Sequence, residues 1–170
     1  MEPSAYTFSS PLAGYESAPS LPDEKAADGK SYVNPQTGIL SESYQRFTEP
    51  LDNGVRGAFF QNNPTQKTFA FELWQRIRHE FPELRIYKFW EGPLGPHPVA
   101  MFEVNLFTPA QFGAFIPWLV INRGPLSALI HPNTVNPKSG EHDEAKRDHT
   151  QRATWMGERL PLDLSIFRST

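Results

Sequence analysis

The strongest constraint on the fold is a helical pattern set between extended apolar segments. A helix is expected over 64–81, because four large apolar residues recur at every fourth position: Phe69, Leu73, Ile77 and Phe81. Asn63 is suited to cap this helix, Pro64 to begin it and Pro82 to end it. Such a helix has one apolar face and must bury that face against another element.

Extended segments precede and follow this helix. Apolar residues alternate or form short runs in four segments that we expect to be strands: 55–60, 85–90, 99–106 and 126–130. A second helix is expected to begin at Pro109 after the capping residue Thr108, with a bend or break near Pro117. The order is therefore strand, helix, strand, strand, helix, strand.

This order predicts an α+β fold of the ferredoxin-like β-α-β-β-α-β type, with an antiparallel sheet and two helices on one face. Two helices cover only one face of the sheet. The other face needs the N-terminal arm, the C-terminal segment or a second subunit. A homodimer that shares this face is the simplest expectation.

The chain divides near residue 53. Residues 1–53 hold eight Asp and Glu against three Lys and Arg, and their apolar residues show no period. This composition favours a mostly disordered acidic arm, from which Tyr44 and Phe47 could dock onto the domain. Residues 54–170 form the predicted domain.

Composition excludes several classes of function. The net charge of −3 gives no polycationic surface, so nucleic acid is not an expected partner. There is no cysteine for a disulfide, a thiolate ligand or a nucleophile. The longest apolar run, 112–121, is too short to span a bilayer, and no secretory signal is visible at the N-terminus. We therefore expect a cytoplasmic protein with a small-molecule partner and no membrane.

Histidines are the best candidates for chemistry near neutral pH. His97 lies between two prolines, His131 ends the last apolar strand, and His149 follows a charged loop. Side chains at the ends of elements often meet in one site. His79 and His142 are instead expected to complement a helix end and to lie in a solvated loop.

Four further side chains are expected to bind substrate near these histidines. They are Arg123, Tyr87, Trp155 and Arg152. Glu103 lies within a predicted strand and could face either side of the sheet.

Several motifs occur in a characteristic order. They are GPHPVAMFEV (95–104), PWLVINRG (117–124), LIHPNT (129–134), DHT (148–150) and WMGERLPLDLS (155–165). This series resembles the DOPA 4,5-dioxygenase family of fungi and bacteria, from about Phe59 to Phe167. The resemblance implies a ferredoxin-like fold and O2-dependent extradiol cleavage of a catechol at Fe(II). It also implies that His131 and His149 are the metal ligands or the acid–base pair, with His97 beside them.

One position departs from the family pattern. Gly57 stands where the first strand of the family carries a histidine. A divalent metal held by imidazoles needs more neutral ligands than the two that remain, so we expect little or no bound iron.

Three functions therefore follow from the sequence and the resemblance. The first is ring cleavage of a catechol-like or polycyclic aromatic molecule. The second is metal-independent acid–base catalysis, such as a cyclisation, dehydration or rearrangement in secondary metabolism. The third is non-catalytic binding of an aromatic ligand.

Overall fold

A computed structural model describes residues 10, 12–14, 16–34, 41–47, 52–135 and 144–167. The chain forms two compact units, Met1–Ile39 and Leu40–Thr170. In the first unit, Lys25 and Tyr32 pair as an isolated antiparallel bridge, and Lys25 Nζ lies 3.2 Å from the centre of the Tyr32 ring. The second unit begins before the boundary at residue 53 that we inferred from composition.

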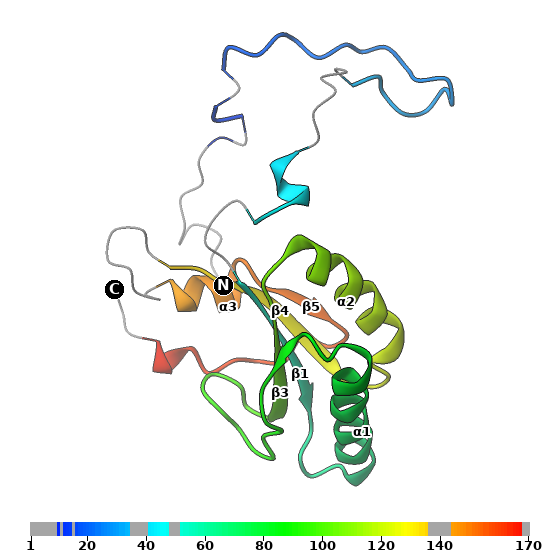
Figure 1. The fold of residues 1–170 in the computed structure, drawn as a ribbon. Coiled ribbons are helices and arrows are strands. Elements are labelled where there is room, and N and C mark those ends of the chain that lie inside the picture. The colour runs from blue at the N-terminus through cyan, green and yellow to red at the C-terminus, as the bar shows by residue number, and fades with distance from the viewer. Residues whose placement is uncertain are drawn as a thin grey trace. The chain divides into compact units, whose positions relative to one another are not determined.

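The second unit is built on one five-stranded antiparallel sheet (Figure 1). Its strands are β1 (Asp52–Phe59), β2 (Arg85–Ile86), β3 (Ala100–Leu106), β4 (Ser127–Asn133) and β5 (Thr154–Met156). Their spatial order is β2-β3-β1-β4-β5, and every neighbouring pair is antiparallel. The first four strands have the order of a ferredoxin-like sheet, so the predicted fold class is confirmed. β5 adds an edge strand beside β4.

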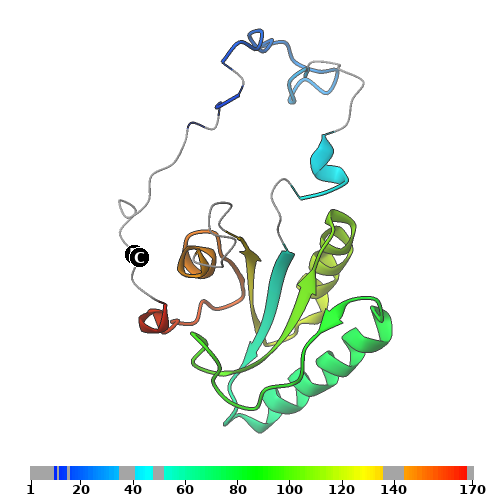
Figure 2. The ribbon, with the colours of Figure 1, turned by 60° about the vertical axis from the view of Figure 1, so that its left-hand side comes forward.

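Two long helices cover one face of this sheet (Figure 2). α1 (Pro64–Glu80) is capped by Asn63, whose side chain accepts a hydrogen bond from the Gln66 N–H. α2 (Pro109–Asn122) is capped in the same way by Thr108. We expected a bend or a break near Pro117; the break is wrong, because α2 continues through this proline as one helix.

The core lies between the sheet and these two helices. Residues directly opposite in an antiparallel pair share a face, so the β1 residues at positions 55, 57 and 59 point to the helices together. Apolar side chains from the neighbouring strands join them: Ala100, Phe102, Val104, Leu106, Ala128 and Ile130.

The opposite face of the sheet carries polar residues. Register places Arg56 opposite Glu103, and Gly54 opposite both Asn105 and His131. α3 (Ala145–Thr150) and the C-terminal segment with η3 (Leu164–Ile166) lie on this side (Figure 2). Because the chain itself covers this face, the face alone no longer argues for a homodimer, which stays a prediction.

The strand expected over 85–90 is much shorter in the structure. Only Arg85–Ile86 pairs as a strand, and Trp90 forms an isolated bridge with Met101. Between them the carbonyl of Tyr87 accepts a hydrogen bond from the Trp74 indole N–H instead of a strand partner. The Trp74 side chain, which belongs to α1, thus replaces part of the backbone hydrogen bonding that would extend β2.

The 3-10 turn η2 (Glu42–Tyr44) precedes the sheet. The Phe47 ring lies edge-on to Phe112 at 6.3 Å, as the docking prediction requires. Tyr44 is 74% exposed, so the same prediction fails for this residue. Among the described residues, no helix is long and apolar enough to cross a membrane.

Candidate functional site

Three histidines that are far apart in sequence meet on the polar face of the sheet. The rings of His131 and His149 lie 4.1 Å apart between centroids, and those of His97 and His149 lie 5.7 Å apart. All three side chains are buried. We call His97, His131 and His149 the histidine cluster.

His131 is positioned by β4. Its Nδ1 lies 2.8 Å from the carbonyl oxygen of Pro132. A carbonyl only accepts, so Nδ1 carries the proton and Nε2 of the neutral ring is an acceptor. Gly54 on β1 leaves the space that this ring needs, because a Cβ there would lie 3.2 Å from His131 Nε2.

His149 is positioned by α3. Its Nδ1 lies 2.8 Å from the Ala145 carbonyl, one helical turn back, which again leaves Nε2 as the acceptor. The preceding residue, Asp148, is buried and anchors the helix. It accepts hydrogen bonds from the N–H and hydroxyl of Thr134 and from Arg152, each 2.8–2.9 Å long.

His97 comes from the turn before β3. Leu94 and His97 form a bridge in which each backbone N–H donates to the other residue's carbonyl. The side chain is 3% exposed, and its Nε2 has no hydrogen-bond partner among the described residues. A buried ring nitrogen without a partner is a candidate contact for a ligand.

An arginine lies at the centre of the cluster. Arg56 Nη1 donates to His131 Nε2 and, at 2.6 Å, to His149 Nε2. Arg56 Nε donates to Glu103 Oε2 at 3.1 Å, and both side chains are only about one-eighth exposed. The guanidinium is therefore held from β1, β3, β4 and α3 at once.

Burial and this guanidinium set the charge of the histidines. The pKa of His97 is lowered to about 3, that of His131 to about 2 and that of His149 to about 4. In each case burial is the largest cause and the positive charge of Arg56 is the next. All three rings are therefore neutral near pH 7.

Gly57 lies on the other side of the sheet. A Cβ on this residue would meet the Phe102 ring at 2.7 Å, within the core under α1 and α2. Our assignment of Gly57 as the position of a lost ligand is thus wrong, because side chains alternate along β1. The β1 positions that face the histidines are Gly54 and Arg56.

Replacing Gly57 by histidine is therefore expected to destabilise the domain and not to create a ligand. The imidazole would have to displace the Phe102 ring, and overpacking of this kind costs roughly 1–3 kcal/mol. Urea unfolding of Gly57→His measures this loss. An unchanged stability together with new metal binding would contradict the placement of Gly57.

The predicted substrate contacts divide into two groups. Arg152 binds Asp148 and Thr134 and thereby supports α3, and Trp155 lies opposite Leu129 on the histidine face of the sheet. Arg123 is not at the site, because its guanidinium donates to the carbonyls of Gly124 and Leu126 below α1 and α2.

Tyr87 lies beside β3, where its N–H bonds to the Glu103 carbonyl. Its side chain is 39% exposed, with the ring 6.2 Å from Trp90. A substrate contact by Tyr87, Trp155 or Arg152 stays a prediction. His142 lies outside the described residues.

Sequence reasoning missed Arg56. A signal was present, because Arg56 is the one charged residue of the strand predicted over 55–60, and Glu103 is the one charged residue of the strand predicted over 99–106. Two opposite charges inside neighbouring strands indicate a buried pair once the register is known.

The residues present do not fit a divalent metal ion as they are arranged. The Nε2 atoms of His131 and His149 converge on one point, which is how two ligands would hold a metal. The Arg56 guanidinium occupies that point. It donates hydrogen bonds to the lone pairs of both Nε2 atoms, and its positive charge repels a metal cation.

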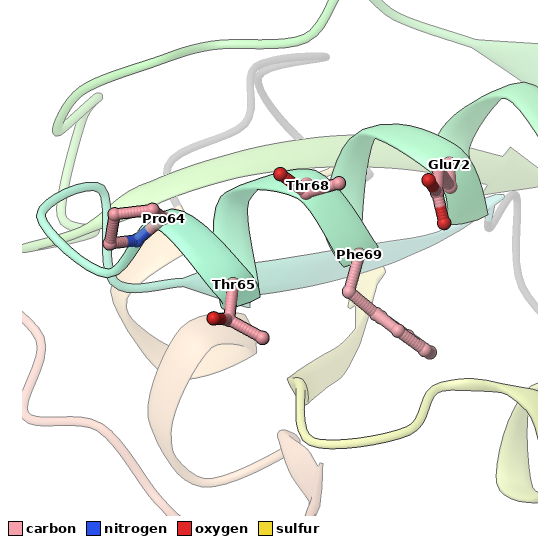
Figure 3. Close-up of a pocket in the computed structure, with 5 residues that line it drawn as sticks. All are labelled: Pro64, Thr65, Thr68, Phe69 and Glu72. Atoms are coloured by element: carbon pink, nitrogen blue, oxygen red, sulfur yellow. The ribbon is translucent and has the colours of Figure 1, made fainter.

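A hollow of about 420 Å³ lies elsewhere, on the surface of α1 (Figure 3). It is lined by Pro64, Thr65, Thr68, Phe69 and Glu72. Glu72 is the only ionisable group in this lining, so the hollow offers no set of converging reactive groups. The histidine cluster is the better candidate site.

Comparison with known proteins supports a family relationship. A protein of Botryotinia fuckeliana described only as an uncharacterized 21.2 kDa protein is 68% identical over 98% of this chain and 94% of its own length. The DOPA 4,5-dioxygenase of Amanita muscaria is 34% identical over 63% of this chain, which spans only 45% of that enzyme.

A crystal structure of a dioxygenase-like protein from Nostoc punctiforme PCC 73102 has the same fold. It matches with a TM-score of 0.53 and 25% identity, over 75% of this chain and 96% of that one. The sequence model of the Dopa 4,5-dioxygenase family matches residues 56–166. This match covers most of the chain and includes all three residues of the histidine cluster, so the chain belongs to the Dopa 4,5-dioxygenase family.

Proposed function

We propose that this protein is an enzyme that transfers protons on a small hydroxylated aromatic molecule without a metal ion. One observation carries the proposal: the Arg56 guanidinium lies against the Nε2 atoms of His131 and His149. Two neutral imidazoles and one fixed positive charge are the groups needed to deprotonate a hydroxyl or a carbon acid and to stabilise the anion that forms.

His149 is the preferred base. Its pKa, about 4, is the least lowered of the three, and its tautomer makes Nε2 the basic nitrogen, which can take a proton once a bound substrate anion replaces it as the acceptor of the Arg56 hydrogen bond. An anionic substrate oxygen beside Arg56 would offset the positive charge that holds this pKa down. Substrate binding thus brings the base nearer to the pH at which it must work.

His97 is suited to bind or protonate a second group of the substrate. Its buried Nε2 has no partner in the described part of the chain, and its ring lies 5.7 Å from that of His149. The two imidazoles can therefore serve two atoms of one small molecule. In this scheme Arg56 holds the anion in place, and the two imidazoles move the protons.

The C-terminal segment contacts the elements that carry His149 and His97. The Phe167 ring lies 5.2 Å from that of His149, and the Asp163 N–H donates to the Pro96 carbonyl at 2.8 Å. These contacts close the site on the side of η3. The segment must move, or leave a path beside it, for each turnover.

Replacing Phe167 by alanine is expected to expose His149. Modification of histidine by diethylpyrocarbonate, followed by mass spectrometry, should then be severalfold faster at His149 and unchanged at His79, which is exposed at the end of α1. Equal rates at His149 in the wild type and in Phe167→Ala would contradict a closing role for this ring.

The proposed function is tested with metal removed. The protein is incubated with EDTA in D2O and a panel of catechols and hydroxylated aromatic ketones, and exchange or turnover is followed by proton NMR. We expect activity that falls by about 100-fold or more in His149→Ala and persists in the control His79→Ala. Turnover that needs added Fe(II) would contradict the proposal.

Ring cleavage is the second candidate, because the chain belongs to a family named for this activity and is similar to a named DOPA 4,5-dioxygenase. Anaerobic addition of Fe(II), then a catechol and O2, should in that case consume O2 and give a yellow product. Ligand binding that survives both His131→Ala and His149→Ala without any turnover would favour a non-catalytic binding protein instead.

A further inference from the structure

The Arg56 guanidinium lies at the point on which the Nε2 atoms of His131 and His149 converge, where a metal ion would bind. The rings of His131 and His149 are each fixed by a bond from Nδ1 to a backbone carbonyl. Both Nε2 lone pairs then accept a hydrogen bond from the same atom, Arg56 Nη1. In metal sites of proteins, one ring nitrogen of a histidine usually donates a hydrogen bond to a fixed acceptor, and this orients the other nitrogen toward the metal. Here Nδ1 is the fixed nitrogen and Nε2 is the oriented one.

The guanidinium is held firmly in this place. Arg56 and Glu103 lie directly opposite each other in the β1–β3 register, and their side chains form a salt bridge of 3.1 Å. Both are about one-eighth exposed, so water screens the pair little. Moving the arginine out would leave the Glu103 carboxylate buried without its partner.

We propose that Arg56 is a built-in cation that takes the place of a divalent metal ion between His131 and His149. Consequently the Arg56 side chain, and not a lack of imidazoles, prevents a divalent metal from binding at this site. Replacing this side chain by a histidine is expected to convert the site to a metal site, because position 56 faces the same point as the two Nε2 atoms.

Binding of Co2+ tests this inference, since its visible absorption reports both affinity and coordination. The wild type, Arg56→His and Arg56→Met are freed of metal and titrated with Co2+ alone. Lys88→His is the matched control, because it adds an imidazole at an exposed position away from the cluster. A thermal unfolding transition in each variant shows that the domain is folded.

We expect the wild type and Lys88→His to bind Co2+ no better than surface histidines do. Arg56→Met should bind about tenfold more tightly than the wild type, because the repelling charge is gone. Arg56→His should bind about 100-fold more tightly than the wild type, because a further ligand is added. If Arg56→His does not fold, the Co2+ affinity of Arg56→Met relative to the wild type decides whether the inference stands.

Two results would overturn the inference. One is a wild type that binds Co2+ as tightly as Arg56→His does. The other is a pair of folded variants that bind no better than the wild type. Neither result depends on turnover, so the inference can fail while the proposed proton transfer stands, and the reverse also holds.

Discussion

Replacing Glu103 by alanine is expected to lower the free energy of unfolding by about 3–5 kcal/mol. The change leaves the Arg56 guanidinium largely buried, with its ion-pair partner gone and two imidazoles beside it. An uncompensated buried charge is far more costly than a lost surface interaction. Equilibrium urea unfolding measures the difference.

Two further variants make this test specific. Glu91→Ala breaks the exposed pair with Lys67 and should change stability by less than about 1 kcal/mol. The double variant Arg56→Met, Glu103→Ala removes both charges and should recover much of the loss. A loss of under about 1 kcal/mol in Glu103→Ala would show that Arg56 does not depend on this carboxylate.

Acidification is expected to destabilise the domain already below about pH 6.5, the usual pKa of histidine. The three cluster histidines have folded-state pKa values of about 3, 2 and 4. The unfolded chain therefore binds protons that the folded chain does not bind, and stability is lost as the pH falls through this window. Each histidine contributes a slope of up to about 1.4 kcal/mol per pH unit.

Urea unfolding at several pH values between 7 and 5 measures this slope. The carboxylates with lowered pKa, such as Glu80 and Asp163, contribute only below their ordinary values near pH 4, so the two effects separate. His79→Ala should keep the slope, because His79 lies outside the cluster. A free energy of unfolding that does not change between pH 7 and 5 would contradict the description of the cluster as neutral and buried.

Local sequence signals predicted most of the fold. The caps Asn63 and Thr108 and the apolar face of α1 located both helices, and the strand pattern located β1, β3 and β4. Two features could not be read locally. The strand at residue 85 stops early, where the Trp74 indole N–H donates to the Tyr87 carbonyl, and α2 passes unbroken through Pro117.

The histidines of the site could be predicted, but the group between them could not. His97, His131 and His149 stand at the ends of elements, and the ferredoxin-like topology brings such ends together. Assigning Gly57 to the site failed by one residue, which in a strand moves a side chain to the opposite face. Register, which a single sequence does not give, decides whether Gly57 or Arg56 faces the histidines.

The most direct test of the account is the protonation state of the cluster. Long-range proton–nitrogen NMR spectra of the 15N-histidine-labelled protein at about pH 5.5 report both charge and tautomer of each ring. We predict that His97, His131 and His149 are neutral, and that His131 and His149 carry their proton on Nδ1. Charged rings at His131 and His149 at this pH, or protons on Nε2, would contradict a cluster whose lone pairs are directed at Arg56.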